Sequence, residues 1–392
     1  MRKKTKLLLR DAFYSTLLSC LLIAVLALFF SLRFFNPLHK ALTDFSFLDV
    51  YYSENFQGSD KINTDIVLVN VGNENREMIG KGLQAIIKAQ PRTVGVDVLF
   101  KDLKEDVAAD SLLASLLTND AVVTSYNIVE NTEVHNHPIF GDNENRGFVN
   151  INFDESTTVV REFVGSKIFN GQERLSFASQ MAKHYLQDKW ESYNYDDKLK
   201  KAKTIKFQGD YNAFLHLDLA DLKPDHNPIF KDKIVILGYL GRDVIGAKTD
   251  IEDKYFTPLN PYYTGRSDAD MFGATIHANI LNMLIKNDFM LSVSNLWLAV
   301  FTFLVMYFST IFYMKINRKY KVSYRTRKRI YQLITCVAVL ILSFWLFKIN
   351  VVLKPTIIIV GIILAGSYFK YYKHLTRYLK TKSNRKWKTY LK

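Results

Sequence analysis

Four apolar stretches, one near the beginning of the chain and three near its end, constrain the fold more than any other feature of the sequence. The first covers residues 12–32 without a charged residue, and the others cover residues 296–314, 330–347 and 356–369. A bilayer core of about 30 Å requires roughly twenty helical residues, so the first stretch is long enough to span it. The fourth reaches that length only if residues 351–353 join the helix. The sequence therefore predicts four transmembrane helices.

The first apolar stretch has two other interpretations, a cleaved signal peptide and a lipoprotein signal around Cys20. Its apolar run is longer than that of a typical signal peptide, and Arg33, Phe34 and Phe35 follow where small residues would be expected. Ten further apolar residues follow Cys20, which does not fit a lipoprotein signal. We therefore favour an uncleaved membrane anchor.

Basic residues flank the apolar stretches and predict their orientation. Residues 315–329 hold eight Lys and Arg, residues 370–392 hold nine, and neither segment contains an acid. Cytoplasmic segments next to transmembrane helices carry such an excess. With four spans, both termini and the basic loop lie in the cytoplasm and residues 36–291 lie outside it. We expect the basic segments to rest against anionic lipid headgroups.

The net charge of +14 would suggest a nucleic-acid partner, but its distribution excludes one. Residues 36–291 contain 27 Lys and Arg and 37 Asp and Glu, so the part of the chain outside the apolar stretches is acidic. A nucleic-acid-binding domain needs a basic face on its folded part. Cys20 and Cys336 both fall in apolar stretches, so residues 36–291 contain no disulfide.

Residues 36–291 alternate short β-branched runs with segments of helical periodicity. This alternation favours an α/β domain with a mixed, partly parallel sheet and flanking helices. Strands are predicted at residues 65–71, 92–100, 121–126 and 233–238, and helices at 73–90, 106–117, 175–188 and 273–285.

Three further segments carry expectations of their own. We expect residues 147–153 and 157–168 to form an antiparallel pair, and the charged residues 188–203 to be exposed. The helix at residues 273–285 is expected to continue almost directly into the second transmembrane helix.

Motif searches give no catalytic or metal site. Residues 241–249 resemble a phosphate-binding loop, but Ala247 stands where that loop needs its lysine, which favours a turn. His135 and His137 lack further ligands nearby, which favours a solvated pair over a metal site. No hydrolase motif occurs, and we predict neither enzymatic activity nor a cofactor.

Ligand-binding candidates follow from strand ends and from one acid. Asp97 lies in a predicted buried strand, where a carboxylate needs a partner, a ligand or a structural role. Ligands of open α/β sheets bind at the carboxyl ends of strands. The candidates at such ends are Asn70, Gly238, Tyr239 and Arg242.

With these segments identified, residues 36–291 resemble the class-two CHASE domain, an extracytoplasmic sensory module of bacterial membrane receptors. Each matching segment is short, but their order along the chain is specific. The matches are 44–49 (DFSFLD), 66–71 (IVLVNV), Pro91, 95–100 (GVDVLF), 110–114 (DSLLA), 147–150 (GFVN), Val160-Arg161, 234–238 (IVILG), Asp253, Thr257-Pro258, Gly273 and 276–279 (IHAN). The resemblance adds Asp253, Thr257 and His277 to the ligand-binding candidates.

Members of that family place the domain between one N-terminal and three C-terminal transmembrane helices, in the bacterial cytoplasmic membrane. They continue into a kinase or cyclase domain, whereas here only residues 370–392 follow the last apolar stretch. The resemblance therefore implies a sensor that signals through a separate partner. The expected segments are residues 1–11 (cytoplasmic), 12–35 (span), 36–291 (sensor domain), 292–314 (span), 315–329 (cytoplasmic loop), 330–347 and 351–369 (spans), and 370–392 (cytoplasmic tail).

Two other interpretations stay open at the level of sequence. One is a structural or assembly subunit of a cell-envelope complex, and the less favoured one is an extracytoplasmic enzyme using Asp97, Asp253 and His277. The sequence names neither the ligand nor the protein partner, and it leaves homo-oligomerisation open.

Overall fold

The computed structural model describes residues 2–30, 49–52, 61–130, 132–141, 144–151, 158–223, 227–247, 249–260, 268–320, 323–382 and 388–391. The chain divides into two compact units. The helical unit contains residues 1–42 and 291–392, and the α/β unit contains residues 43–290. Residues 31–35 of the predicted first span and residues 44–48 of the family's opening segment lie outside the described residues.

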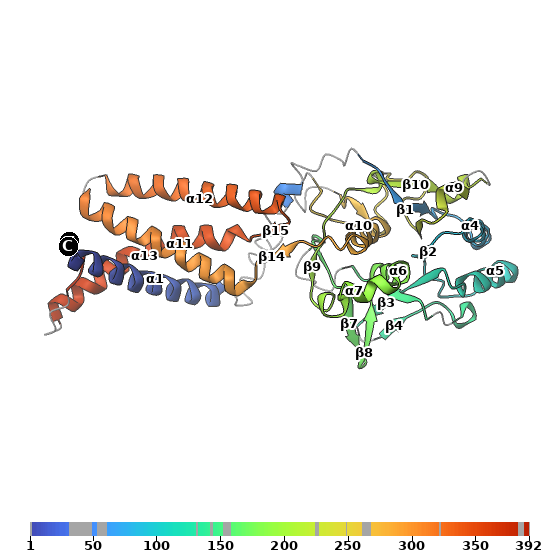
Figure 1. Ribbon diagram of the computed structural model, residues 1–392, viewed down its shortest axis with the longest axis horizontal. Coiled ribbons are helices and arrows are strands. Elements are labelled where there is room, and N and C mark those ends of the chain that lie inside the picture. Colours follow the sequence, from blue (N-terminus) through green and yellow to red (C-terminus); the bar gives the residue numbers. More distant parts are fainter. Residues whose placement is uncertain are drawn as a thin grey trace. The chain divides into compact units, whose positions relative to one another are not determined.

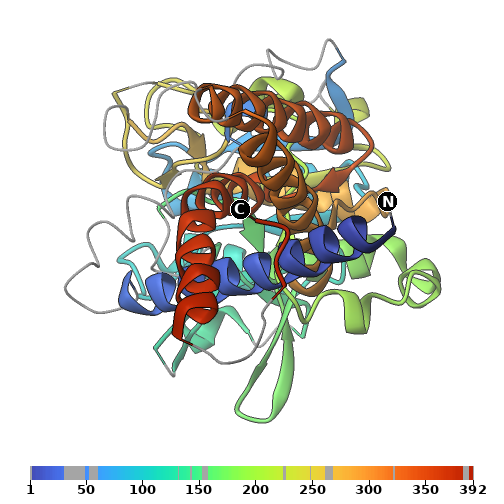
Figure 2. The same ribbon diagram turned by 90° about the vertical axis from the view of Figure 1, so that its left-hand side faces the viewer.

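Four long helices form the helical unit (Figures 1 and 2): α1 (Arg2–Phe30), α11 (Asn295–Lys319), α12 (Tyr324–Lys348) and α13 (Pro355–Lys382). Within the described part of the chain, these four helices are long and apolar enough to cross a membrane. α13 contacts each of the other three, and Figure 2 shows it in red, crossing the blue α1.

The fourth long helix begins later and ends later than the sequence suggested. Val351 and Val352 form strand β15 (Val351–Val352), which pairs in parallel with β14 (Leu291–Ser292). Residues 351–353 therefore do not join the fourth helix, which begins at Pro355 and runs through Lys382 into the predicted tail. Proline suits a first helical turn because its missing N–H would have no partner there.

The predicted basic loop is likewise mostly helical. Among residues 315–329, α11 continues to Lys319 and α12 begins at Tyr324. The predicted start of the second span at residue 292 is also wrong, because residue 292 belongs to β14 and α11 begins at Asn295. Ser294 caps α11 by accepting a hydrogen bond from the backbone N–H of Trp297 at 3.5 Å.

A seven-stranded sheet, counted over the described residues, forms the centre of the α/β unit. Its order is β10-β1-β11-β2-β3-β4, with β5 paired to β3; β4 is antiparallel to β3 and the other pairs are parallel. The mixed, partly parallel sheet is thus confirmed. The strands are β1 (Asn63–Asn70), β2 (Thr93–Val96), β3 (Val122–Val129), β4 (Thr132–Val134), β5 (Arg146–Phe148), β10 (Phe214–Asp218) and β11 (Ile234–Gly238).

Helices cover both faces of this sheet (Figure 1). Buried valines such as Val67 and Val69 point to one face, where they pack with α4 (Arg76–Lys88), α5 (Val107–Leu117) and α9 (Asn227–Phe230). The other face carries α6 (Phe177–Leu186) and α10 (Gly273–Ile285). At Gly95 a Cβ atom would lie 2.3 Å from the Met181 sulfur, so glycine lets α6 pack closely on β2.

The middle of the α/β unit differs from the prediction. β5 pairs with β3 rather than with residues 157–168, and residues 152–157 lie outside the described part of the chain. The hairpin there joins β7 (Ser166–Phe169) to β8 (Gln172–Leu175) through Asn170 and Gly171, which have φ angles of 49° and 76°. Asn-Gly is the preferred pair for such a two-residue turn.

The charged residues 188–203 are only partly exposed, contrary to the prediction. They form α7 (Asp188–Ser192), α8 (Tyr195–Lys198) and the start of β9 (Lys203–Thr204), and they bury Trp190, Tyr195 and Leu199. The remaining elements are β6 (Glu162–Phe163), β12 (Lys254–Tyr255), β13 (Met271–Phe272), η2 (Pro138–Phe140), η3 (Tyr211–Ala213) and η4 (Leu219–Asp221).

Helix α10 matches the predicted range and is buried from Gly273 to Leu284. The sequence led us to expect that α10 continues almost directly into the second span, but it does not. Asn287 adopts a left-handed φ of 48°, a conformation that ends helices, and β14 intervenes before α11 begins. Residues 286–294 therefore link α10 to α11 without helical structure.

Candidate functional site

Asn70 holds the carboxyl edge of the sheet together. Its amide nitrogen donates to Asp218 Oδ1 at 2.7 Å and to the Gly241 carbonyl at 2.9 Å. Its amide oxygen accepts from the backbone N–H groups of Leu240 at 2.7 Å and Gly72 at 3.1 Å. Because these contacts saturate the amide, Asn70 fixes the loops of this edge.

A pocket of about 400 Å³ opens beside Asn70. Arg242 also lines it, so two of the predicted residues meet there. The Arg242 guanidinium contacts Glu252 at 3.3 Å and is mostly exposed. The other charged side chains of this lining are all acidic: Glu74, Asp218, Asp221 and Asp243.

Tyr239 and Arg242 are held by a shared carboxylate. The Tyr239 hydroxyl donates to Asp250 Oδ2 at 2.5 Å, and the backbone N–H of Arg242 donates to the same oxygen at 2.8 Å. Burial and this carboxylate raise the pKa of Tyr239 to about 12. These contacts order the loop that follows Gly238.

Asp97 lies directly after β2, not within a strand as predicted, because β2 ends at Val96. Its backbone N–H still donates to the Leu237 carbonyl at 2.8 Å. Its side chain keeps some solvent-exposed surface but packs next to Gly238, where a Cβ atom would lie 3.3 Å from the Asp97 Cβ. Removal from water, together with the nearby Asp253 carboxylate, raises the pKa of Asp97 to about 8.

Asp253 places a second carboxylate near Asp97, at the first turn of α10. A Cβ atom at Gly273 would lie 2.7 Å from Asp253 Oδ2, so glycine makes room for this carboxylate. Asp253 keeps exposed surface, yet the loss of water around its carboxyl raises its pKa to about 6, against hydrogen bonds from Gly273 and Tyr255. Burial and the two acids raise the pKa of Tyr255 to about 12.

The two carboxyl groups therefore differ in protonation near neutral pH. Because the pKa of Asp97 is raised further than that of Asp253, Asp253 is the first of the two to lose its proton as the pH rises. Such a pair offers one negative charge and one O–H donor at the same place. Chemically, this arrangement can donate one hydrogen bond and accept a cationic group beside the beginning of α10.

The other predicted residues lie in two separate environments. Thr257 donates its backbone N–H to Asp270 Oδ1 at 2.8 Å, and its hydroxyl bonds the other oxygen. Burial raises the pKa of Asp270 to about 6. His277 is buried in α10, 5.3 Å from the Phe177 ring centroid, and burial lowers its pKa to about 4. Its Nδ1 atom has no hydrogen-bond partner among the described residues.

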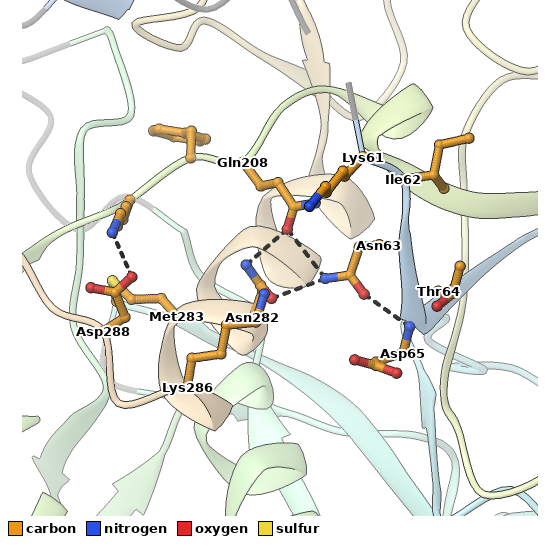
Figure 3. Close-up of a pocket in the computed structure, with 12 residues that line it drawn as sticks. Lys61, Ile62, Asn63, Thr64, Asp65, Gln208, Asn282, Met283, Lys286 and Asp288 are labelled. Atoms are coloured by element: carbon orange, nitrogen blue, oxygen red, sulfur yellow. Dashed lines mark hydrogen bonds and ion pairs between the residues drawn. The ribbon is translucent and has the colours of Figure 1, made fainter. Parts of the chain in front are cut away.

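The opposite, amino edge of the sheet carries a cluster that the sequence did not predict (Figure 3). Three carboxamides meet there, from β1 (Asn63), from the segment before η3 (Gln208) and from the last turn of α10 (Asn282). Asn63 Nδ2 donates to Asn282 Oδ1 at 2.9 Å and to Gln208 Oε1 at 3.2 Å, and Asn282 Nδ2 donates to Gln208 Oε1 at 2.9 Å. We call these three residues the amide triad.

The amide triad lines a pocket of about 450 Å³, which we call the amide pocket. Charged side chains of both signs surround it. Lys206 pairs with Asp288 at 2.5 Å, and Asp65 pairs with Lys233 at 3.1 Å. Besides the triad, the lining is formed by Lys61, Ile62, Thr64, Asp65, Lys206, Phe207, Met283, Lys286 and Asp288.

The amide pocket was not predicted, because the ligand candidates came from the carboxyl ends of strands, from the acid Asp97 and from the family resemblance. A signal was present nonetheless. Asn282 is one of several polar residues on the buried helix α10, and Asn63 begins a largely buried strand. A buried amide needs hydrogen-bond partners, so both residues mark a polar contact inside the fold.

No metal centre is found among the described residues, where no group of three or more His, Cys, Asp or Glu could hold an ion. His135 Nε2 contacts Glu133 at 3.0 Å, and His137 Nδ1 accepts from the backbone N–H of Ile139. The segment 241–249 forms turns with positive φ at Gly241 and Gly246, and Lys248 lies outside the described residues.

Comparison with protein-family models finds a match to the CHASE2 domain over residues 21–312. The chain belongs to the CHASE2 domain family. The match includes the whole α/β unit and reaches into α11, and it confirms the resemblance drawn from the ordered sequence segments. CHASE2 is a family of sensory domains, which supports a sensor role for this protein. Comparisons with curated proteins and with solved structures find no match.

Proposed function

We propose that this CHASE2 protein is a membrane-anchored sensor that binds a small polar ligand outside the cytoplasm and signals through its transmembrane helices to a separate protein partner. The proposal places the protein in a bacterial cytoplasmic membrane with both termini in the cytoplasm. The charge distribution supports that orientation, since residues 315–329 and 370–392 are basic and without acids.

The observation that carries the proposal is the path of helix α10. Its first turn lies at the carboxyl edge, where Ala274 is close to Gly238 and Gly273 to Asp253. Its last turn supplies Asn282 to the amide triad at the amino edge. The thirteen residues of α10 thus connect the two candidate sites.

Only residues 286–294 separate this helix from α11, a candidate membrane span. A ligand that moves the last turn of α10 therefore acts directly on the chain that enters α11. Coupling of this kind needs a rigid element that both sites contact, and the buried helix α10 is suited to it.

The amide pocket is the favoured ligand site. It is larger than the pocket beside Asn70 at the carboxyl edge, whose lining is mostly acidic. The last turn of α10 lines the amide pocket with Asn282 and Met283. Lysines and acids both line the amide pocket, so it suits a small polar molecule with groups of either charge.

The test uses the full chain in lipid nanodiscs and a panel of amino acids, dicarboxylates, sugars and polyamines. We expect at least one compound to raise the melting temperature and to change amide hydrogen exchange in residues 286–294. The Asn282→Leu variant should lose both effects. The Lys88→Ala variant, changed at an exposed residue of α4, should keep them.

Two results would oppose the proposal. A compound that stabilises the α/β unit and leaves exchange in residues 286–294 unchanged would separate binding from signalling. A stoichiometric protein partner that co-purifies, with no response to any compound of the panel, would favour a structural subunit of an envelope complex.

A further inference from the structure

The helical unit contains one acidic residue among many basic ones. Residues 1–42 and 291–392 hold 26 Lys and Arg, and Asp11 is their only Asp or Glu. Asp11 lies in α1 and its side chain is fully buried. A buried carboxylate is costly unless donors surround it, so the identity of its partners shows what this position stabilises.

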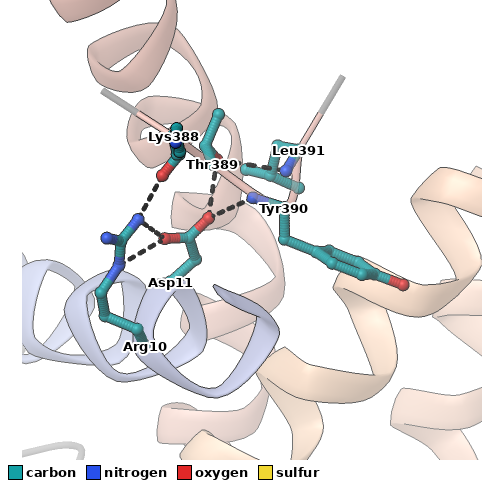
Figure 4. A network of polar contacts seen from close by, with 6 residues as sticks. All are labelled: Arg10, Asp11, Lys388, Thr389, Tyr390 and Leu391. Atoms are coloured by element: carbon teal, nitrogen blue, oxygen red, sulfur yellow. Dashed lines mark hydrogen bonds and ion pairs between the residues drawn. The ribbon is translucent and has the colours of Figure 1, made fainter. Parts of the chain in front are cut away.

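The C-terminal segment Lys388–Leu391 supplies two of those partners (Figure 4). Asp11 Oδ2 accepts from the Thr389 hydroxyl at 2.6 Å and from the backbone N–H of Tyr390 at 2.7 Å. Asp11 Oδ1 accepts from Arg10 at 3.0 Å. One carboxylate thus joins the beginning of the chain to its end.

Two arginines bind the backbone of the same segment. Arg10 donates to the carbonyl of Lys388, and Arg318 of α11 donates to the carbonyl of Tyr390 at 3.3 Å. The Arg318 guanidinium also lies over the Tyr390 ring, 4.6 Å from its centroid. Together with the Tyr390 N–H, three contacts recognise the backbone of the segment rather than its side chains.

Leu391, at the end of this segment, packs in an apolar cluster. Leu391 is 4% exposed and packs in a cluster with Leu8 and Ala12 of α1, Met314 of α11, and Phe369 and Tyr372 of α13. The segment therefore combines backbone hydrogen bonds, a hydroxyl on a carboxylate, a ring under a guanidinium and an aliphatic anchor. Peptide-binding grooves use the same combination of backbone contacts and side-chain pockets.

We propose that α1, α11 and α13 form a groove that binds a short extended peptide, and that the chain's own Lys388–Leu391 occupies it as a displaceable segment latched by Asp11. The groove recognises a hydroxyl residue, then an aromatic one, then an aliphatic one. This inference is independent of the amide pocket. Displacement of the segment exposes Tyr390 and Leu391 and opens the groove.

The experiment measures the reactivity of a thiol at position 391. Leu391→Cys is placed in the full chain, in nanodiscs, and labelled with a charged maleimide. We expect slow labelling, and at least tenfold faster labelling when Asp11→Asn is added. Lys6→Ala, an exposed change on the same helix, is the matched control and should leave the rate unchanged.

The native thiols report on the bundle itself. Cys20 and Cys336 are partly buried in α1 and α12, so their labelling stays slow if Asp11→Asn releases only the C-terminal segment. A displacing peptide with the sequence of residues 386–392 should accelerate labelling at position 391. A peptide with the threonine, tyrosine and leucine replaced by alanine should not.

Three results would overturn the inference. Labelling at position 391 as fast as that of a free peptide carrying the same Leu391→Cys change would show that the segment does not occupy the groove. Equal labelling rates with and without Asp11→Asn would show that Asp11 does not hold the segment in the groove. No acceleration by the matching peptide would show a fixed part of the bundle rather than a displaceable segment. None of these results bears on the ligand response of residues 286–294, so the proposed function is tested separately.

Discussion

The two units place a fully buried and a partly buried carboxylate in opposite surroundings. In the helical unit, Asp11 is surrounded by donors from Arg10, Thr389 and the Tyr390 backbone. In the α/β unit, Asp97 lies near a second acid, Asp253, and its pKa rises to about 8. The first carboxylate is satisfied and holds two ends of the chain together. The second lies beside another acid, so its ionised form is unfavourable there.

The largest expected effect tests the satisfied carboxylate. Replacing Asp11 with Ala leaves the Tyr390 N–H and the Thr389 hydroxyl without their acceptor. We expect the free energy of unfolding of the helical unit to fall by about 3 kcal/mol, because each buried donor that loses its acceptor costs about 1–3 kcal/mol. Unfolding in mixed micelles by detergent titration measures it. A loss below about 1 kcal/mol would contradict the assigned role.

A second comparison concerns glycines at helix contacts in the two units. At Gly147 of the α/β unit, a Cβ atom would lie 2.5 Å from the Phe177 Cα, which is backbone. At Gly361 of α13 it would lie 3.0 Å from the sulfur of Met306, a flexible side chain. We expect Gly147→Ala to lower the free energy of unfolding of the α/β unit by about 2–3 kcal/mol. Gly361→Ala should lower that of the helical unit by less than about 1 kcal/mol. Equal costs in thermal and detergent unfolding would oppose this account.

The amide triad should show an intermediate effect. Asn282→Leu leaves Gln208 Oε1 with one donor fewer and Asn63 Nδ2 with one acceptor fewer. We expect a loss of about 2 kcal/mol in the free energy of unfolding of the α/β unit, measured by chemical denaturation. The Lys88→Ala control should change it by less than about 0.5 kcal/mol. If Asn282→Leu leaves the free energy of unfolding unchanged, the triad does not hold α10 to β1.

The smallest effect has the opposite sign. The folded state keeps the Asp97 proton up to about pH 8, whereas the unfolded chain loses it near the ordinary value of 3.8. Stability therefore falls as the pH rises from 4 to 8. Because solvent around the partly exposed Asp97 screens most of this penalty, we expect Asp97→Asn to raise the melting temperature at pH 8 by about 3 °C, with no gain at pH 4. A lower melting temperature at pH 8 would show that Asp97 is paired when ionised.

Local patterns in the sequence predicted the regular elements of the α/β unit well. Helix α10 has the predicted bounds, and it begins at Gly273 and ends at Ile285. β1 and β11 were recognisable as buried, near-continuous apolar strands. The four long apolar helices were predicted from length and charge alone.

Several features that the sequence did not predict depend on pairing between distant residues. β15 pairs with β14, whose sequence lies 60 residues earlier, so residues 351–352 could not be assigned from their own hydrophobicity. The Asp11 latch joins α1 to residues 389 and 390, and the amide triad joins three separate segments. Among the predicted site residues, the carboxyl edge gathers Asn70, Gly238, Tyr239 and Arg242, while His277 lies apart from them in α10.

Hydrogen exchange of residues 286–294 at pH 8, compared between the wild-type chain and Asp97→Asn in nanodiscs, tests the central claim most directly. That pH is close to the raised pKa of Asp97, so part of the wild-type carboxyls are ionised beside the first turn of α10, whereas the amide of the variant stays neutral. The account predicts slower exchange in residues 286–294 of the variant, because a neutral side chain leaves α10 undisturbed. Unchanged exchange there, with altered exchange around residue 97, would contradict transmission through α10.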